Sequence, residues 1–361
     1  MANSFDAMRL TVQAVYPTND VLMDDKGMPS FMVYIPAFRL CDVLSTSDTS
    51  VHPAFKVNGK QIPGFYVGKY QTKKYNGRAY SLPAQVPVVA QNYDQVRNQC
   101  TAKGTGWHEL TNAEWAALAL WCHKNGSEPK GNNSSGKDAS ESMRVAVPSA
   151  NSGTTTTVLT GTGPATWSHN GQMDGVFDLN GNVWEWVTGL RLVYGEVQVL
   201  ADNNAAVTGA NLAASSAEWK AIRASDGALV TPNGSGTTAG TVKLDWVNGA
   251  WRYTTTITNK NNQSLLCELK NVTADYTVGA AAKLLLQALA MLPDTALTGS
   301  NIDANYGGNG LWANNGMAEC CATRGGDWTV GTRLGVFALY LSDPRTATFV
   351  GVGGRCGYVA Q

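Results

Sequence analysis

The sequence predicts an α+β fold that is rich in loops. Hydrophobic residues make up 43% of the 361 residues and charged residues 15%, which is enough apolar material for a large core. The chain contains 38 Gly and 11 Trp, a combination typical of irregular segments held by large aromatic rings, although a Trp-rich core would also explain it. Segments with a helical or strand pattern are short, and stretches rich in Gly, Ser, Asn and Thr separate them.

Two short strands are predicted early in the chain. Residues 31–36 are apolar and end at Pro36, which stops a strand because proline cannot donate to a sheet. Residues 64–70 alternate in a way that suits one buried face. Residues 1–30 mix polar and apolar side chains and end in a turn-like stretch at 24–27, so we expect them to form a separate N-terminal segment.

Two helices are predicted next, each with a capping box at its start. The helix over 92–102 begins with Asn92 and Gln95, and the helix over 111–125 begins with Thr111 and Glu114. Each ends just before a glycine. The second helix carries Trp115, Leu118 and Cys122 on one stripe, with Ala119 beside it, which predicts one buried face.

The middle of the chain is predicted to be less regular. Residues 126–163 are rich in Gly, Ser, Asn and Thr and are expected to form a long surface loop. Within 201–280, short alternating runs at 240–246 and 251–257 indicate hairpins. Residues 280–292 have the composition of a buried helix that ends at Pro293.

Composition excludes several classes of protein. A formal net charge of zero and a sequence pI of about 6.9 argue against nucleic-acid binding, which needs a basic surface. The sequence contains no run of 18 apolar residues, so we expect no membrane-spanning helix. Residues 1–16 do not resemble a signal peptide. The odd number of widely spaced cysteines is expected to give reduced, buried thiols. They are Cys41, Cys100, Cys122, Cys267, Cys320, Cys321 and Cys356.

The most specific motif is the stretch GNVWEW within residues 175–186. It resembles the signature of the formylglycine-generating-enzyme family, the sulfatase-modifying-factor domains. Shorter matches occur in the family's order at 33–36, 66–70, 110–115, 324–328 and 354–356. The resemblance implies a C-type lectin-like fold over 31–361. Residues 201–300 lie between matching segments, so we expect a β-rich insertion at the edge of that one domain.

The turn at the motif is a candidate calcium site. The resemblance implies that Asp178 and Glu185 would supply carboxylates, and Gly181 and Val183 main-chain carbonyl oxygens. Hard oxygen ligands of this kind suit Ca²⁺, which would have a structural role. The alternative is that Glu185 hydrogen-bonds the backbone within the core. No cofactor is required by either interpretation.

The residues that the family needs for catalysis are missing. Formylglycine-generating enzymes hold copper with a pair of cysteines in the C-terminal segment, and residues 324–352 contain no cysteine. Cys320 and Cys321 are adjacent, so on a strand they would face opposite sides. Related iron enzymes need three histidines, and the four here show no ligand spacing. We therefore expect a protein that is not an enzyme; a metal-dependent oxidase of the family's type is the alternative.

The C-terminal segment 324–358 resembles the variable proteins of diversity-generating retroelements, which share the lectin fold. The resemblance implies that a reverse transcriptase rewrites selected codons of this segment, and that the product binds a ligand without catalysis. Residues 327–352 contain no Lys, Glu, Gln or Met, against about three expected from the chain's own usage. Gly-rich sheet segments also avoid charged residues, so this observation supports the assignment without deciding it.

Alternation on the predicted strand 336–341 would bury Phe337, Leu339 and Leu341 and expose Tyr340. Residues assigned to the scaffold are Trp328, Gly331, Gly335, Arg345, Gly353 and Arg355. The positions predicted to vary and to contact ligand are Asp327, Thr329, Val330, Thr332, Arg333, Leu334, Tyr340, Ser342, Asp343, Thr346, Thr348, Phe349 and Val350. We expect them to form one exposed surface; an ordinary solvent-exposed loop is the alternative.

Residues 19–36 resemble the start of phage-encoded proteins of this group. The resemblance implies a place on the virion and a partner on the host surface, either a protein or a glycan. A further alternative is an inert structural component of the virion, in which the C-terminal segment binds nothing. The ligand itself cannot be derived from a surface that is built to vary.

Overall fold

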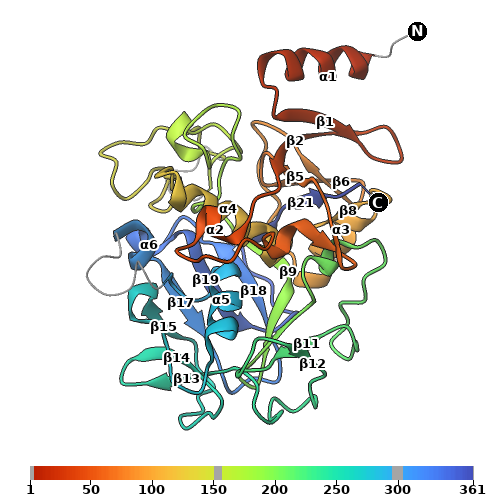
Figure 1. Ribbon diagram of the computed structural model, residues 1–361. Coiled ribbons are helices and arrows are strands. Elements are labelled where there is room, and N and C mark those ends of the chain that lie inside the picture. Colours follow the sequence, from red (N-terminus) through yellow and green to blue (C-terminus); the bar gives the residue numbers. More distant parts are fainter. Residues whose placement is uncertain (1–3, 150–156, 295–303, 361) are drawn as a thin grey trace.

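The computed structural model describes residues 4–149, 157–294 and 304–360. These residues form a five-stranded sheet, a twelve-stranded sheet, two small hairpins and a few helices, which confirms the mixed α+β class. Figure 1 shows the five-stranded sheet beside both chain ends and the larger sheet below it. Among the helices of these residues, none combines the length and the apolar character needed to cross a membrane.

The five-stranded sheet has the order β1-β2-β5-β21-β8, so the last strand of the chain lies between two early ones. Its strands are β1 (Asn19–Met23), β2 (Pro29–Pro36), β5 (Gly64–Gly68), β8 (Trp107–Glu109) and β21 (Cys356–Tyr358). β2 and β5 are the strands predicted at 31–36 and 64–70, and they pair antiparallel. Two hairpins lie outside the large sheets: β3 (Lys56–Val57) with β4 (Lys60–Gln61), and β6 (Thr72–Tyr75) with β7 (Arg78–Ser81).

The N-terminal segment differs from the expectation of a separate piece. It contains a helix that was not predicted, α1 (Ser4–Val15), followed by β1. β1 pairs with β2 from Asn19 opposite Val33 to Met23 opposite Pro29, across the turn predicted at 24–27. Arg9 on α1 forms an ion pair with Asp20, with 2.6 Å between Nε and Oδ1. The sheet of the main domain therefore begins at residue 19.

The twelve-stranded sheet is built around β9, the strand that contains the WEW motif. Its main order is β15-β17-β19-β18-β9-β10-β13-β14-β16; β11 and β12 join through β10, and β20 pairs with β9. The strands are β9 (Trp184–Val193), β10 (Glu196–Val199), β11 (Lys220–Ile222), β12 (Leu229–Val230), β13 (Lys243–Val247), β14 (Ala250–Thr254), β15 (Leu265–Glu268), β16 (Thr273–Ala274), β17 (Gly310–Ala313), β18 (Cys320–Gly325), β19 (Gly335–Asp343) and β20 (Val352–Gly354).

Strands within the described residues 201–294 extend this sheet. The hairpin indicated by the runs at 240–246 and 251–257 is β13 and β14, which pair over five positions. β13 also pairs with β10. Leu244 and Trp251 belong to the same hydrophobic cluster as Trp115, so their side chains add to the main core.

Both predicted capping boxes are present. α3 (Tyr93–Thr101) begins after Asn92, whose side chain accepts a hydrogen bond from the Gln95 backbone, and the Gln95 side chain reciprocates. α4 (Asn112–Lys124) begins after Thr111 in the same way, with Glu114 as partner. Each box satisfies two backbone N–H groups that would otherwise lack partners at the helix start, which explains why these two helices are readable from local sequence.

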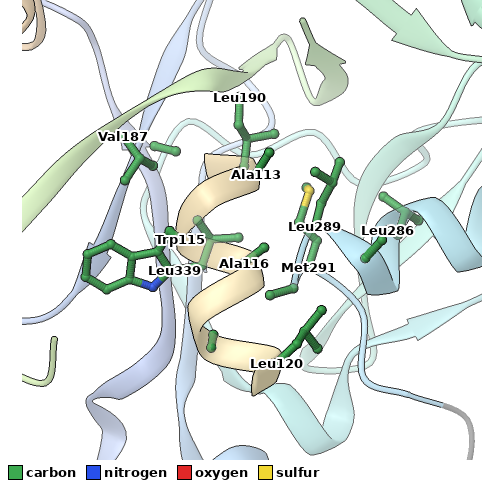
Figure 2. Close-up of a cluster of buried hydrophobic side chains, with 14 of the residues drawn as sticks. Ala113, Trp115, Ala116, Leu120, Val187, Leu190, Leu286, Leu289, Met291 and Leu339 are labelled. Carbon is green, nitrogen blue, oxygen red and sulfur yellow. The ribbon is translucent and has the colours of Figure 1, made fainter. Parts of the chain in front are cut away.

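α4 is more deeply buried than its stripe predicted. Every residue from Asn112 to Leu120 is buried, so the helix has no solvent-facing side over this stretch. Figure 2 shows why: β9 supplies Val187 and Leu190 on one side, while α5 supplies Leu286 on the other. The alanines of α4 allow this close approach. The Trp115 indole also donates to the Val336 carbonyl at 2.7 Å, which ties α4 to β19.

The remaining helices are short. They are α2 (Leu40–Val43), α5 (Ala280–Ala288), α6 (Ala304–Gly308) and the 3-10 turns η1 (Pro53–Phe55), η2 (Ala165–Trp167), η3 (Asn204–Ala206), η4 (Leu269–Asn271) and η7 (Gly331–Arg333). α5 starts where the sequence predicted, at 280, but ends at Ala288, four residues early. Leu289 and Met291 continue into the core without helical structure.

The region 126–163 is irregular, as predicted, but its described residues are not all at the surface. Asn132, Asn133 and Asp138 are buried, and so are Val158 and Thr160. Their polar groups are paired: Asn133 donates to Asp138 at 2.9 Å, and Asn132 donates to Asn182 in the motif turn at 3.2 Å. These side-chain hydrogen bonds replace the backbone ladder of a regular element, which composition alone does not reveal.

The expectation that all cysteines are reduced is wrong for one pair. Cys100 on α3 and Cys356 on β21 form a disulfide across 256 residues of sequence. The other five cysteines are free; Cys41 is half-buried and the rest are buried. Nothing in the spacing of Cys100 and Cys356 indicates the pairing, because it depends on α3 packing beside β21.

Candidate functional site

The C-terminal segment lies across the motif strand. β18 pairs antiparallel with β9, and β20 pairs parallel with it, so that Val352 lies opposite Trp184. β19 in turn pairs with β18. Phe337, Leu339 and Leu341 of β19 are buried, as the alternation predicted. Tyr340 was predicted to be exposed and is half-buried, and Val336 and Ala338 on the same side of the strand are buried.

Two irregular stretches complete this surface, and backbone hydrogen bonds hold both. The Ser135 N–H donates to the Trp328 carbonyl and the Gly331 N–H donates to the Asn133 carbonyl, each at 2.9 Å. The loop before β20 is fixed by the Ala90 N–H, which donates to the Phe349 carbonyl at 2.9 Å. The loops that carry the predicted variable positions are therefore anchored through their main chain, whatever their side chains are.

These elements enclose a cavity of about 310 Å³, which we call the aromatic cavity. Four aromatic residues, two aspartates and five small or aliphatic residues line it. They are Trp184, Trp328, Tyr340, Phe349, Asp327, Asp343, Thr323, Thr329, Val350, Gly351 and Val352. The Trp184 and Tyr340 ring centroids are 5.7 Å apart with their planes at 58°, and Trp312 packs against both behind them.

The thirteen predicted positions are distributed over two cavities and the surface outside them. Six line the aromatic cavity: Asp327, Thr329, Tyr340, Asp343, Phe349 and Val350. Thr332 and Leu334 line a second cavity of about 230 Å³ together with residues of the 128–140 region. Arg333, Thr346 and Thr348 are exposed and Val330 is half-buried, outside both cavities. Ser342 is buried and lines neither.

Three of the sequence assignments are corrected by burial. Leu334, predicted to contact ligand, is 3% exposed because it packs directly over Gly326. Ser342, also predicted to contact ligand, is 5% exposed and accepts a hydrogen bond from Ser264 at 2.9 Å. Trp328, assigned to the buried scaffold, is half-buried and forms part of the cavity wall.

Trp184 is the cavity residue that sequence reasoning missed. Trp184 and Trp186 alternate with Glu185, a strand pattern that favours burial of both rings on one side. Trp186 is fully buried, whereas Trp184 is half-buried at the first position of β9, where the cover over the strand ends. The position of Trp184 at the end of the strand is the signal that could have distinguished its burial from that of Trp186.

The two cavity aspartates differ in their surroundings. Asp327 Oδ1 accepts hydrogen bonds from the Thr329 N–H at 2.9 Å and the Thr329 hydroxyl at 2.7 Å. Asp343 ends β19 and is half-buried, and this burial raises the pKa of its carboxyl group to about 6. Burial also raises the pKa of Tyr340. The cavity thus disfavours uncompensated negative charge, yet it holds two carboxyl groups.

Three buried or half-buried arginines fix the scaffold beneath the cavity. Arg355 binds Glu185 through two hydrogen bonds, of 2.8 Å and 2.7 Å. Arg324 is fully buried and donates to Asn112 and to main-chain carbonyls, and burial lowers its pKa to about 9. Arg345 forms two hydrogen bonds with Glu319, of 2.6 Å and 2.8 Å. Arg345 and Arg355 were assigned to the scaffold from the sequence.

The oxygens proposed as calcium ligands at Gly181, Val183 and Glu185 lie around a side-chain nitrogen instead. Gln71 Nε2 lies 3.1 Å from the Asp178 carbonyl oxygen, 3.3 Å from that of Gly181 and 3.1 Å from that of Val183. It lies 3.0 Å from Glu185 Oε1. A hydrogen-bond donor at the centre of this group does not fit a calcium ion in the same place.

Asp178 also departs from the expected role. Its main-chain oxygen faces Gln71, while its carboxylate Oδ2 accepts a hydrogen bond from the Gly161 N–H at 2.8 Å. The other carboxylate oxygen is buried without a hydrogen-bond partner among the described residues, and burial raises the pKa of Asp178 to about 6.

The thiols and imidazoles are dispersed within the fold. Burial raises the pKa of Cys320 to about 12 and also raises that of Cys321 well above its ordinary value, which disfavours the thiolate needed for metal binding or nucleophilic attack. Burial lowers the pKa of His52 and of His169 to about 4, and His108 pairs with Glu114. Across the described ranges, no three His, Cys, Asp or Glu side chains gather into a possible metal site.

Comparison with known proteins gives distant structural matches. No family model and no curated protein matches the sequence. Treponema denticola variable protein 1 is 12% identical, covers 95% of this chain and 99% of its own, and has a TM-score of 0.35. The Major Tropism Determinant P3c variant is 11% identical over 94% of this chain and 71% of its own, with a TM-score of 0.31.

Variable proteins are thus among the structural neighbours of this chain. PvdO from Pseudomonas aeruginosa also matches, with 21% identity over 47% of this chain and 74% of its own and a TM-score of 0.27. These neighbours are of the kinds that the sequence motifs resemble. At these identities and TM-scores the likeness transfers no residue roles, so the role of each residue is derived from this chain's own geometry.

Proposed function

We propose that this chain is a non-catalytic binding protein that displays its ligand-binding surface on the C-terminal segment. One observation carries the proposal: six positions that the sequence marks as variable line one aromatic cavity. Half-exposed tryptophan and tyrosine rings are the anchors that binding surfaces commonly use. The remaining predicted positions lie outside this cavity, so the aromatic cavity is the centre of the proposed surface.

Two exposed side chains at the rim of the cavity lie on a loop that the main chain holds in place. Phe349 is 48% exposed and Val350 is 73% exposed, while their loop is held by main-chain hydrogen bonds. Beneath them Arg324 and Arg355 are fully buried. Side chains at the rim can therefore change at little cost to folding, which is what diversification by a retroelement requires.

The diversification can be tested genetically. We expect a reverse transcriptase gene near this gene, and a second, near-identical copy of the sequence that encodes the C-terminal segment, differing at adenines. Sequencing many copies of the gene from its source population should show variation at the codons for Asp327, Thr329, Phe349 and Val350. The codons for Arg324 and Arg355 should stay constant. Uniform sequences, or variation spread evenly over the segment, would contradict the proposal.

The binding surface can be tested with a double variant, F349A/V350A. Because both side chains are largely exposed, the free energy of unfolding should change by no more than about 0.5 kcal/mol per residue. Capture from a random peptide library and from a glycan array should fall for this variant. Tyr276→Ala is the matched control, since Tyr276 is 95% exposed and lies far along the chain from the cavity residues. Equal losses in both variants would contradict the assignment.

Tyr340 is not a suitable probe on its own. Sequence alternation predicted an exposed Tyr340, but its ring packs against Trp184 and Trp312. We therefore expect Tyr340→Ala to lower the free energy of unfolding by about 1–3 kcal/mol.

The display of this surface on a virion, facing a host protein or glycan, is part of the same proposal and rests on the resemblance of residues 19–36 to phage-encoded proteins.

A further inference from the structure

The charged side chains that line the aromatic cavity are all acidic. The lining contains four aromatic rings and two carboxyl groups. None of its eleven residues is Lys, Arg, His, Asn or Gln. The wall therefore offers carboxylates and the faces of aromatic rings, and both attract cations.

Asp343 is a cavity residue whose carboxylate lacks a partner among the described residues. It is half-buried at the end of β19, and no described residue donates a hydrogen bond or an ion pair to its carboxylate. A partly desolvated carboxylate without a partner is unfavourable, and burial accordingly raises its pKa to about 6. At neutral pH a cation placed beside it would recover the lost solvation.

The second aspartate acts from the neighbouring loop. Asp327 Oδ1 is occupied by the two hydrogen bonds from Thr329. Its other oxygen lies against Gly351, where an added Cβ would come within 2.8 Å of it. The absence of a side chain at Gly351 keeps this edge of the cavity open beside the carboxylate.

We infer that the aromatic cavity binds a cationic side chain, the ammonium of a lysine or the guanidinium of an arginine, presented by a protein partner. The inference rests on the proposed function and specifies its ligand class. The cation would lie against the rings of Trp184, Tyr340 and Phe349 and form an ion pair with Asp343. A glycan fits less well, because both charged groups of the wall are acidic and neutral sugar hydroxyls carry no positive charge to pair with them.

The test uses the full-length chain with a random peptide library at about pH 7.5, above the pKa of Asp343. We expect the enriched peptides to share a lysine or an arginine. Replacing that residue by norleucine or citrulline should weaken binding at least about tenfold. Asp343→Asn should weaken it to a similar extent without lowering the melting temperature, since the amide has the same shape and no charge. Asp6→Asn, at an exposed position of α1, is the matched control.

Three results would overturn the inference, and the first two separate it from the proposed function. If the chain selects a neutral ligand, such as a glycan from an array, and binding is lost in F349A/V350A but unchanged in Asp343→Asn, the ligand class is wrong and the proposed function stands. If binding is unchanged in both variants, the aromatic cavity is not the binding surface and the proposed function fails as well. Enrichment of the same peptides by wild type and Asp343→Asn also overturns the inference.

A separate observation concerns the motif turn, and we propose that the Gln71 amide takes the place of a metal ion there. Its nitrogen has four oxygen neighbours at 3.0–3.3 Å. Its orientation is set by Asn182, which donates to Gln71 Oε1 at 2.8 Å. Arg355 already compensates the charge of Glu185. A neutral donor and an internal cation together supply what a bound calcium would.

The test measures thermal melting of the wild-type chain in EDTA and in millimolar CaCl₂. We expect the same melting temperature in both, and a lower one for Gln71→Ala, which removes the amide from the buried turn. Gln85→Ala is the control, because the Gln85 amide donates to the Pro83 carbonyl at a partly exposed site. A wild-type melting temperature that falls in EDTA and recovers with calcium would overturn the proposal, as would a Gln71→Ala chain that melts like wild type.

Discussion

Glu109 is a buried carboxyl group whose ionisation would destabilise the folded protein. It lies in β8 and is 1% exposed, and neither carboxylate oxygen has a hydrogen-bond partner among the described residues. Burial raises its pKa well above 4.5, so the folded state favours the protonated form. Ionised Glu109 would be a buried charge without compensation.

We predict that Glu109→Gln stabilises the protein, and increasingly so as the pH rises. An acid whose folded-state pKa is raised contributes its full stability below the unfolded pKa and loses it as the pH rises through the folded pKa. The variant should therefore match wild type near about pH 4 and melt at a higher temperature near about pH 8. Glu218→Gln, an exposed carboxylate, is the control. A stability difference that is the same at both pH values would contradict the prediction.

α4 illustrates how an element can be recognised from its ends and misjudged along its length. Its capping box gives its start, but its alanine-rich sequence conceals that it is enclosed on all sides. Ala116 and Ala117 are fully buried, and the neighbouring β9 and α5 approach the helix there (Figure 2). Small side chains in this helix therefore reflect close packing as well as helix propensity.

We predict that Ala116→Leu lowers the free energy of unfolding by about 1–3 kcal/mol, because the added side chain has no space in a packed interior. Ala281→Leu on α5 is the matched control, since Ala281 is exposed; its effect should stay within about 0.5 kcal/mol. Chemical denaturation of both variants provides the measurement. Equal destabilisation of the two chains would show that the substitution acts through helix propensity, and would contradict close packing around α4.

The molecule as a whole is closed by its C-terminal strands. β20 pairs with β9 of the large sheet and β21 lies within the five-stranded sheet, so the last residues join both sheets. The disulfide between Cys100 and Cys356 fixes this closure to α3. It lies close to the buried Arg355, which holds Glu185 and the motif turn. Stability and the position of the proposed binding surface therefore depend on the same terminal strands.

We predict that replacing both Cys100 and Cys356 by Ala lowers the free energy of unfolding by about 2–5 kcal/mol, because the cross-link restricts a long loop of the unfolded chain. Cys41→Ala, at a half-buried free thiol, is the control and should have a small effect. Adding a reductant should destabilise wild type and leave the double variant unchanged. If reductant affects both chains equally, the disulfide does not contribute to stability.

Several features of this protein followed from local sequence. The capping boxes at Asn92 and Thr111 gave two helices, and alternation with proline or glycine at the ends gave β2, β5 and β19. The same alternation correctly buried Phe337, Leu339 and Leu341. These signals are readable because each acts within a few residues, where backbone hydrogen bonds and side-chain direction are set.

The site itself depended on contacts between segments that are far apart in sequence. Leu334 is buried because it packs over Gly326. Trp184 is half-buried at the first residue of β9, whereas the residues that directly follow it in the strand are buried. Gln71 reaches the motif turn from more than 100 residues away, and Cys100 meets Cys356 across 256. Local patterns set which side of a strand a side chain takes. Whether that side meets protein, solvent or a cavity is set by the packing of distant segments, because burial is a property of the neighbours and is not encoded in the residue alone.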